Sequence, residues 1–176
     1  LATLKSMKEQ NLDALLMFRQ ESMFWLTGYD TFGYVFFQTL ILDQKGNIVL
    51  LTRAPDLRQA QNTSNIEDIR IWVDKEVCNP TDDLKIILNE LNLEDKKIGI
   101  EYEAYGMTGR NALRLNKSLE DYCEVKDQSE LITKHRVDKS QEEIIYVKKA
   151  AELADQALDE AWKYGKAGAS EAKILA

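Results

Sequence analysis

Short apolar runs alternate with helix-like segments along most of this sequence, and this alternation is what most restricts the fold. The runs are rich in branched aliphatic and aromatic residues and are bounded by turn residues, as in β-strands. They cover residues 14–18, 34–42, 48–52, 69–73, 98–102 and 122–125. Repeated strand–helix units of this length predict a mostly parallel sheet with right-handed crossovers and helices on both faces. We therefore expect a three-layer α/β domain.

One pair of these strands is expected to be antiparallel. Residues Asp43–Gly46 have the composition of a tight turn, and they join the runs 34–42 and 48–52 directly. Strands joined by so short a connection pair in opposite directions. The expected sheet is therefore mixed rather than purely parallel.

The clearest helix between the strands starts at Asn79. Asn79 is a good N-cap residue, Pro80 suits the first helical position, and Asp82 and Asp83 lie where the helix dipole favours anions. Its apolar stripe consists of Leu84, Ile87, Leu88 and Leu91. The other helices expected in this part of the chain cover residues 4–10, 22–27, 56–64, 108–117 and 130–135.

The last fifth of the chain predicts a long helix that needs something to pack against. Ser140 and Glu143 have the spacing of a capping box, in which each side chain bonds the backbone amide of the other. Behind them, apolar residues recur at alternating spacings of three and four. They are Ile144, Val147, Ala151, Ala154, Leu158 and Ala161. Ser170 and Glu171 start another helix close to Ala176, so we expect a domain that is cut short there.

The composition excludes several classes of function. The chain is 44% hydrophobic and 30% charged, as in globular proteins, and its net charge of -7 argues against a nucleic-acid surface. No apolar run approaches the roughly 20 residues that span a bilayer. Cys78 and Cys123 provide neither a disulfide framework nor a metal-ligand spacing, as expected of a reducing cytoplasm. We expect a cytoplasmic protein with neither nucleic acid nor membrane as a partner.

The residue types that usually carry catalysis are sparse. His135 is the only histidine and has no Cys, Asp or Glu at ligand spacing, so we expect a solvated residue. Glu101 and Glu103 should share one face of a strand and could divide acid and base roles, but a structural or solvated pair is the simpler interpretation. The glycines of the stretch Gly28–Gly33 lack the spacing of a phosphate-binding turn. We assign no catalytic residue and no metal ligand to this chain.

A segment rich in aromatic residues keeps a functional interpretation. Residues 29–37 contain five aromatic side chains, and core packing explains only some of them. Tyr29, Phe32 and Tyr34, at the loop end, suit an interface or a ligand wall. Arg53 could hold a substrate carboxylate, although an ion pair with Asp56 is the simpler account. The candidate substrate-binding residues are Tyr29, Tyr34, Phe36 and Arg53.

Four passages together resemble the creatinase/prolidase/aminopeptidase P family. Residues 13–17 followed by Phe24–Tyr29 resemble the opening strand and the "YLTGY" turn of its N-terminal domain, and Ile98–Glu101 resembles a later strand. Residues Arg136–Trp162 resemble the junction to the first helix of a metal-dependent "pita-bread" hydrolase domain, and Gly168–Glu171 resembles the turn into its second helix. The resemblance implies an N-terminal-like domain at 1–135 and the start of a truncated catalytic domain at 136–176.

The resemblance also implies a function. Relatives of this kind hydrolyse bonds next to proline, or open creatine or ectoine, and the peptidases use two divalent ions (Mn, Co or Zn) held in the catalytic domain. In dimeric relatives, the segment that corresponds to residues 29–37 reaches the active-site mouth of the neighbouring subunit. We therefore expect a non-catalytic domain, with no cofactor of its own. It would contact its own catalytic domain, support a homodimer and contribute Tyr29, Tyr34, Phe36 and Arg53 in trans to the cleft for a small peptide.

Three alternatives remain open from the sequence. The same domain could belong to a hydrolase of a small amide such as ectoine or creatine. Against creatine, the aligned stretch has Tyr34 and Phe36 where the creatine-opening branch has an arginine. The chain could also belong to a non-enzymatic, peptide-binding relative of the histone-chaperone type, although it lacks long acidic tracts. The third alternative is a free-standing ligand-binding domain.

Overall fold

The computed structural model describes residues 2–76 and 78–175. The chain divides into two compact units, Leu1–Arg136 and Val137–Ala176. The domain boundary expected from the sequence, between His135 and Arg136, falls one residue before this division. Leu1 and Ala176, where the two expected domains begin and end, lie outside the described residues.

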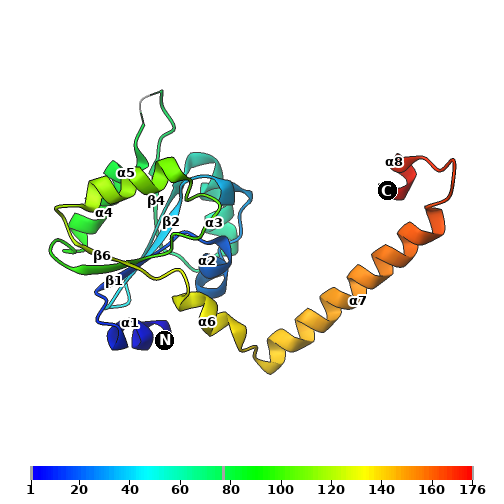
Figure 1. Ribbon diagram of the computed structural model, residues 1–176, viewed down its shortest axis with the longest axis horizontal. Coiled ribbons are helices and arrows are strands. Elements are labelled where there is room, and N and C mark those ends of the chain that lie inside the picture. Colours follow the sequence, from blue (N-terminus) through cyan, green and yellow to red (C-terminus); the bar gives the residue numbers. More distant parts are fainter. Residues whose placement is uncertain (1, 77, 176) are drawn as a thin grey trace. The chain divides into compact units, whose positions relative to one another are not determined.

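The first unit is built on a six-stranded sheet with the strand order β4-β3-β2-β1-β5-β6 (Figure 1). The strands are β1 (Ala14–Met17), β2 (Thr39–Asp43), β3 (Ile48–Arg53), β4 (Asp68–Trp72), β5 (Lys97–Ile100) and β6 (Glu124–Asp127). Strand β2 pairs antiparallel with both β1 and β3, whereas the other three pairs are parallel. Five strands therefore share one direction and β2 opposes them, which confirms the predicted mixed, mostly parallel sheet and its hairpin.

Helices cover both faces of this sheet, as predicted for a three-layer α/β domain (Figure 1). One face carries α4 (Pro80–Glu90) and α5 (Gly109–Leu119). The other carries α1 (Ala2–Glu9), α2 (Gln20–Thr27), α3 (Leu57–Thr63) and α6 (Leu131–Val137). Two 3-10 turns, η1 (Phe32–Val35) and η2 (Ala54–Asp56), complete the unit.

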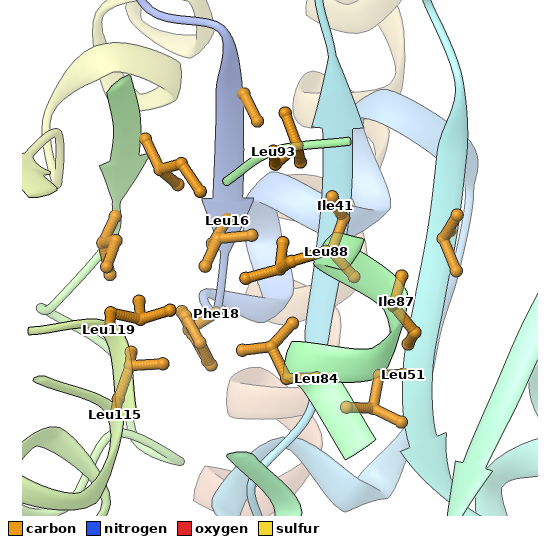
Figure 2. Close-up of a cluster of buried hydrophobic side chains, with 14 of the residues drawn as sticks. Leu16, Phe18, Ile41, Leu51, Leu84, Ile87, Leu88, Leu93, Leu115 and Leu119 are labelled. Atoms are coloured by element: carbon orange, nitrogen blue, oxygen red, sulfur yellow. The ribbon is translucent and has the colours of Figure 1, made fainter. Parts of the chain in front are cut away.

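Each face of the sheet has its own hydrophobic core. In the core drawn in Figure 2, Leu16 and Ile41 of the sheet meet Leu84 and Leu88 of α4 and Leu115 of α5, and all five side chains are fully buried. The opposite core includes Leu15, Leu40, Leu42 and Leu50 of the sheet. Every residue of β1 and β2 is buried, which explains why these strands are continuous apolar runs rather than alternating ones.

The local helix signals are confirmed. The Asn79 side chain accepts the Thr81 amide, with Pro80 as the first residue of α4, and the Thr108 hydroxyl accepts the Asn111 amide at the start of α5. Gly28 ends α2 with a φ of 80°, and a Cβ there would lie 2.8 Å from the Thr63 carbonyl oxygen. Glycine is therefore required at this helix end by both backbone angle and space.

The predicted strand over residues 34–42 is wrong in its first half. Phe32–Val35 form η1, whose Thr31 cap accepts the Gly33 amide at 2.9 Å, and β2 begins only at Thr39. The side chains therefore do not alternate as a strand would require, since Val35 is 46% exposed. The cause is tertiary. The backbone at Gly33 packs on the Asp56 carboxylate so closely that a Cβ would lie 2.5 Å from its Oδ1.

The second unit consists of α7 (Gln141–Tyr164) and α8 (Glu171–Leu175). The capping box is present: Ser140 donates its amide to the Glu143 carboxylate at 2.7 Å, and Glu143 donates its amide to the Ser140 hydroxyl at 3.1 Å. No residue of α7 is buried, and Val147 and Leu158 of its apolar stripe are more than half exposed. Local signals are thus enough to define this helix. None of the helices in the described ranges is long and apolar enough to cross a membrane.

Candidate functional site

The carboxyl ends of five strands meet at one edge of the sheet, because β1, β3, β4, β5 and β6 run in the same direction. In open α/β sheets this edge is the usual place for a ligand. Several charged residues lie there, and three of them are central to the site. Arg19 follows β1, Arg53 is the last residue of β3 and Glu101 follows β5.

Exposed aromatic side chains gather beside this edge. We call Phe32, Tyr34, Val35, Phe36 and Tyr105 the aromatic patch; they are between 40% and 86% exposed. Tyr34 and Tyr105 come from segments far apart in the sequence, and their rings meet edge to face with centres 5.6 Å apart. Such a cluster of exposed aromatic residues is more typical of a binding surface than of ordinary protein surface.

A backbone contact holds the patch together. A Cβ at Gly106 would lie 2.2 Å from the Phe36 carbonyl oxygen, so only glycine lets the 104–107 loop pack against the segment that carries Tyr34 and Phe36. The Asn111 side chain donates to the Gly106 carbonyl oxygen at 2.7 Å, which ties the loop to the first turn of α5. The patch is therefore set in place from two sides.

Arg53 supports the patch from beneath. Its guanidinium donates to the Asp56 carboxylate at 3.1 Å and lies 3.4 Å from the centre of the Phe36 ring, a cation–π contact. Asp56 also accepts the Thr31 hydroxyl at 2.8 Å. The ion pair anticipated from the sequence is therefore present, but it is not a surface pair, because the two side chains are only 17% and 6% exposed.

Tyr29 lies in the core and not at the loop surface where the sequence placed it. Its side chain is fully buried, and its hydroxyl donates to Gln38 at 2.8 Å and lies 3.3 Å from the Thr52 hydroxyl. Burial raises the pKa of Tyr29, since the phenolate would lose its hydration there. Tyr29 anchors the aromatic segment to the sheet and cannot itself face a ligand on this surface. Of the four candidate residues, the structure thus brings Tyr34, Phe36 and Arg53 together at the patch.

Glu101 and Glu103 have different environments. Glu101 is fully buried and accepts the amides of Phe18 and Arg19 and the hydroxyl of Ser22, at 3.1, 3.0 and 2.6 Å. Burial raises the pKa of Glu101, while these hydrogen bonds oppose the shift. Glu103 is exposed and pairs with Arg19 at 2.9 Å. The expectation that the two side chains share one face of a strand is therefore wrong, because β5 already ends at Ile100.

Arg19 was missed by sequence reasoning. Besides pairing with Glu103, it donates to the Thr133 hydroxyl, and it borders an open hollow of about 440 Å³. The hollow is lined by Arg19, Glu21, Tyr102, Glu103, Ala104 and Tyr105, so it adjoins the aromatic patch at Tyr105. One sequence signal could have identified Arg19. It is a charged residue directly after the apolar run 14–18, a position at the carboxyl end of a strand.

His135 is not the solvated residue that the sequence suggested. Its ring stacks on Trp25 with centres 5.9 Å apart, and its Nε2 lies 3.0 Å from the Ser6 hydroxyl. The imidazole ring packs on the flat indole face of Trp25 on α2. Through these two contacts, His135 links α6 to α1 and α2. Within residues 2–76 and 78–175, no group of three or more His, Cys, Asp and Glu side chains could hold a metal ion.

Comparisons with known proteins agree with this architecture. The family model for the Creatinase/Prolidase N-terminal domain matches residues 2–137. The hydrolase/peptidase y4tM of Sinorhizobium fredii, itself named as uncharacterized, is 27% identical over 97% of this chain. The chain spans 45% of that protein.

Solved structures share the fold. An X-Pro aminopeptidase from Thermotoga maritima matches 98% of the chain with a TM-score of 0.76 at 20% identity, and a dipeptidase from Pyrococcus horikoshii matches 93% with a TM-score of 0.73 at 22% identity. The chain covers 45% and 43% of these two proteins, so it spans less than half the length of such relatives. With the family model matching most of its length, this chain belongs to the creatinase/prolidase N-terminal domain family.

Proposed function

We propose that this chain is the non-catalytic N-terminal part of an Xaa-Pro dipeptidase- or aminopeptidase-like metallohydrolase. Residues 1–135 form the N-terminal domain, and residues 136–176 form the junction and first helices of the catalytic domain. Two observations support this division. The X-Pro aminopeptidase and the dipeptidase named above are more than twice as long as this chain, and no residue of α7 is buried.

The observation that carries the proposal is the aromatic patch at the carboxyl edge of the sheet. Its residues are exposed, yet they are fixed by the backbone contact at Gly106 and by the Arg53–Asp56 pair under Phe36. A rigid apolar wall with a cation behind it suits a small peptide, whose apolar side chains pack on aromatic rings. Tyr34, Phe36 and Arg53 form this wall, and Tyr29 holds it from the core.

The wall would act in trans in a homodimer, next to the catalytic domain of the neighbouring subunit, in the cytoplasm. The described residues do not fit a metal site. In our proposal, the two divalent ions (Mn, Co or Zn) are held by the catalytic domain of the hydrolase. This chain's own residues would limit which substrates reach that site. They take no part in bond cleavage.

The test uses the full-length natural protein with an Xaa-Pro dipeptide and added manganese, with ectoine and creatine run in parallel. We expect turnover of the dipeptide alone. Phe36→Ala should raise KM about tenfold or more and change kcat less, because the wall contributes mainly to binding. Phe24→Ala is the matched control, since Phe24 is an exposed aromatic residue of α2 outside the patch.

The other outcomes separate the alternatives. Turnover of ectoine or creatine in place of the dipeptide would reassign the chain to a small-amide hydrolase. A metal-free protein that binds peptides without cleaving them would favour the non-enzymatic relative. If Phe24→Ala and Phe36→Ala have the same effect on KM, the aromatic patch is not the substrate wall.

A further inference from the structure

An open, polar hollow lies at the amino ends of β5 and β6, at the opposite edge of the sheet from the aromatic patch. It measures about 630 Å³, and its lining includes Lys85 of α4, Glu94 and Asp95 before β5, and Asp121 and Tyr122 before β6. The Asp95 amide donates to the Tyr122 carbonyl oxygen at 2.8 Å. The two turns that form the hollow are therefore tied together by their backbones.

The charges in this hollow are not balanced. Glu94, Asp95 and Asp121 form no ion pair with any described residue. The Lys85 ammonium donates to a backbone carbonyl oxygen of α5 at 3.2 Å and lies 5.0 Å from the centre of the Tyr122 ring. Helix α4 has no basic residue in its last turn, so its dipole adds negative potential beside the hollow. Three carboxylates against one ammonium leave the described lining with an excess of two negative charges.

The buried hydroxyl of Tyr122 indicates that this hollow holds a ligand, which exposed carboxylates alone would not. Tyr122 is only 4% exposed, and its hydroxyl has no hydrogen-bond partner among the described residues. Burial, and then the charge of Glu94, raises the pKa of Tyr122 to about 12. The hydroxyl therefore lies near Glu94, on the side of the ring that faces the hollow. A buried hydroxyl without a partner is unfavourable, and a ligand in the hollow would supply that partner.

We propose that this hollow binds a small organic cation with two ammonium groups, a diamine. One ammonium group would donate to the Tyr122 hydroxyl oxygen and to the Glu94 carboxylate, and the other would meet Asp95 and Asp121. Its two positive charges match the excess of two negative charges in the lining.

A metal ion fits the hollow less well than a diamine. Within the described ranges, no group of three or more His, Cys, Asp and Glu side chains could hold a metal ion. Ammonium groups form separate hydrogen bonds and need no closed set of ligands. A protein segment packed here would bury three carboxylates, which is costly unless each meets a cation, whereas a diamine brings both cations in one molecule. The proposal does not depend on the proposed function, since the aromatic patch lies at the other edge of the sheet.

The test is calorimetric titration of 1,4-diaminobutane into the 176-residue chain and into the full-length natural protein, in about 0.15 M salt. We expect a Kd of about 1 mM or lower for both proteins. Butylamine has the same carbon chain but one ammonium group, so it should bind about tenfold more weakly. Calcium chloride at equal concentration should not displace the diamine, because the described carboxylates do not fit a metal ion.

Two kinds of variant test the lining. Tyr122→Phe should weaken diamine binding about threefold or more and should raise the thermal midpoint of the ligand-free chain, because it removes a buried hydroxyl that has no partner. A hydroxyl with a merely structural role would lower that midpoint when removed. Tyr102→Phe is the control, since the Tyr102 hydroxyl bonds Asn116 outside this hollow.

The charge variants are Glu94→Gln and Asp121→Asn, which should each weaken binding about tenfold. Glu120→Gln is their control, because Glu120 is an exposed carboxylate next to Asp121 that lines a different hollow. Its affinity for the diamine should equal that of the wild type.

A wild-type chain that does not bind the diamine would overturn the proposal. Binding that calcium displaces, or that Tyr122→Phe leaves unchanged, would show only a counterion effect of surface carboxylates and would overturn it as well. Binding by the chain but not by the full-length protein would mean that the rest of the longer protein covers the hollow, and this too would refute the site. Should Tyr122→Phe fold poorly by circular dichroism, the two charge variants at exposed positions decide instead.

Discussion

Asp56 and Glu101 lie at the same edge of the sheet, and the chain stabilises the two buried carboxylates by different means. Asp56 faces a cation, the guanidinium of Arg53, and also accepts the Thr31 hydroxyl. Glu101 has no ion-pair partner among the described residues, and it is held by two backbone amides and the Ser22 hydroxyl at the start of α2. Both are almost completely buried.

The two carboxylates stabilise different parts of the structure. Arg53, which pairs with Asp56, also contacts the Phe36 ring. The ion pair therefore helps to fix the position of the aromatic patch. Glu101 instead fixes the turn between β1 and α2, from which the Arg19 side chain reaches Glu103 and Thr133. A buried carboxyl group without a cation beside it resists ionisation. The charge of a buried carboxylate in an ion pair is instead stabilised by its cationic partner. Three substitutions test this contrast.

The largest effect is expected for Asp56→Ala. It leaves Arg53 without its carboxylate and Thr31 with only the Gln59 side-chain oxygen as an acceptor, which should lower the free energy of unfolding by about 2–4 kcal/mol. Urea denaturation of the chain measures it. Asp68→Ala is the control, because the partly exposed Asp68–Arg70 pair should contribute less than about 1 kcal/mol. Equal losses in the two variants would show that the Arg53–Asp56 pair is no stronger than a surface pair.

A smaller effect is expected for Arg53→Lys. Lysine keeps the positive charge but loses the planar group that lies on Phe36 and the directed donors to Asp56. We expect a loss of about 1 kcal/mol, seen as a lower thermal midpoint. Phe36→Leu alone and together with Arg53→Lys separates the stacking from the ion pair. Strictly additive losses would mean that the ring and the cation do not interact.

The smallest effect at neutral pH is expected for Glu101→Gln, which keeps an oxygen for the Phe18 and Arg19 amides and an amide that can donate to Ser22. A change below about 1 kcal/mol is expected there. The pH dependence of the free energy of unfolding should differ more between the wild type and Glu101→Gln. Because the pKa of Glu101 is raised above its ordinary value of 4.5, the folded chain binds the proton more tightly than the unfolded chain does.

Stability from this group is therefore greatest in acid and falls as pH rises through the interval between 4.5 and the higher folded value. Glutamine does not titrate, so Glu101→Gln should gain stability relative to the wild type from acidic to neutral pH. Urea titrations at several pH values measure this, with Glu103→Gln at the exposed position as the control. A wild-type-minus-variant difference that stays constant with pH would refute the idea.

Much of the fold could be predicted because its signals are local. The Asn79–Pro80 start of α4, the Asp43–Gly46 hairpin turn and the Ser140–Glu143 capping box each involve residues at most a few positions apart. Backbone hydrogen bonds and dipoles act over that range, so the sequence pattern is sufficient. Continuous apolar strands likewise predicted a sheet covered on both faces.

The candidate site depended instead on contacts between distant residues. Arg19 meets Glu103 across 84 positions, and His135 meets Ser6 across 129. Segment 32–35 forms a 3-10 turn because Gly33 packs on Asp56, and Tyr29 is buried because Gln38 and Thr52 offer its hydroxyl partners.

The sequence by itself therefore determined the elements, their order and the class of sheet, since propensity, capping and apolar periodicity act along the chain. Only the tertiary structure decided which aromatic and charged side chains face outward, because burial and pairing depend on which strands the fold places side by side. Strands β1 and β5, whose paired residues are 84 positions apart along the chain (98 − 14), become neighbours in the sheet, and their junction sets Arg19, Glu101 and Glu103 in one place.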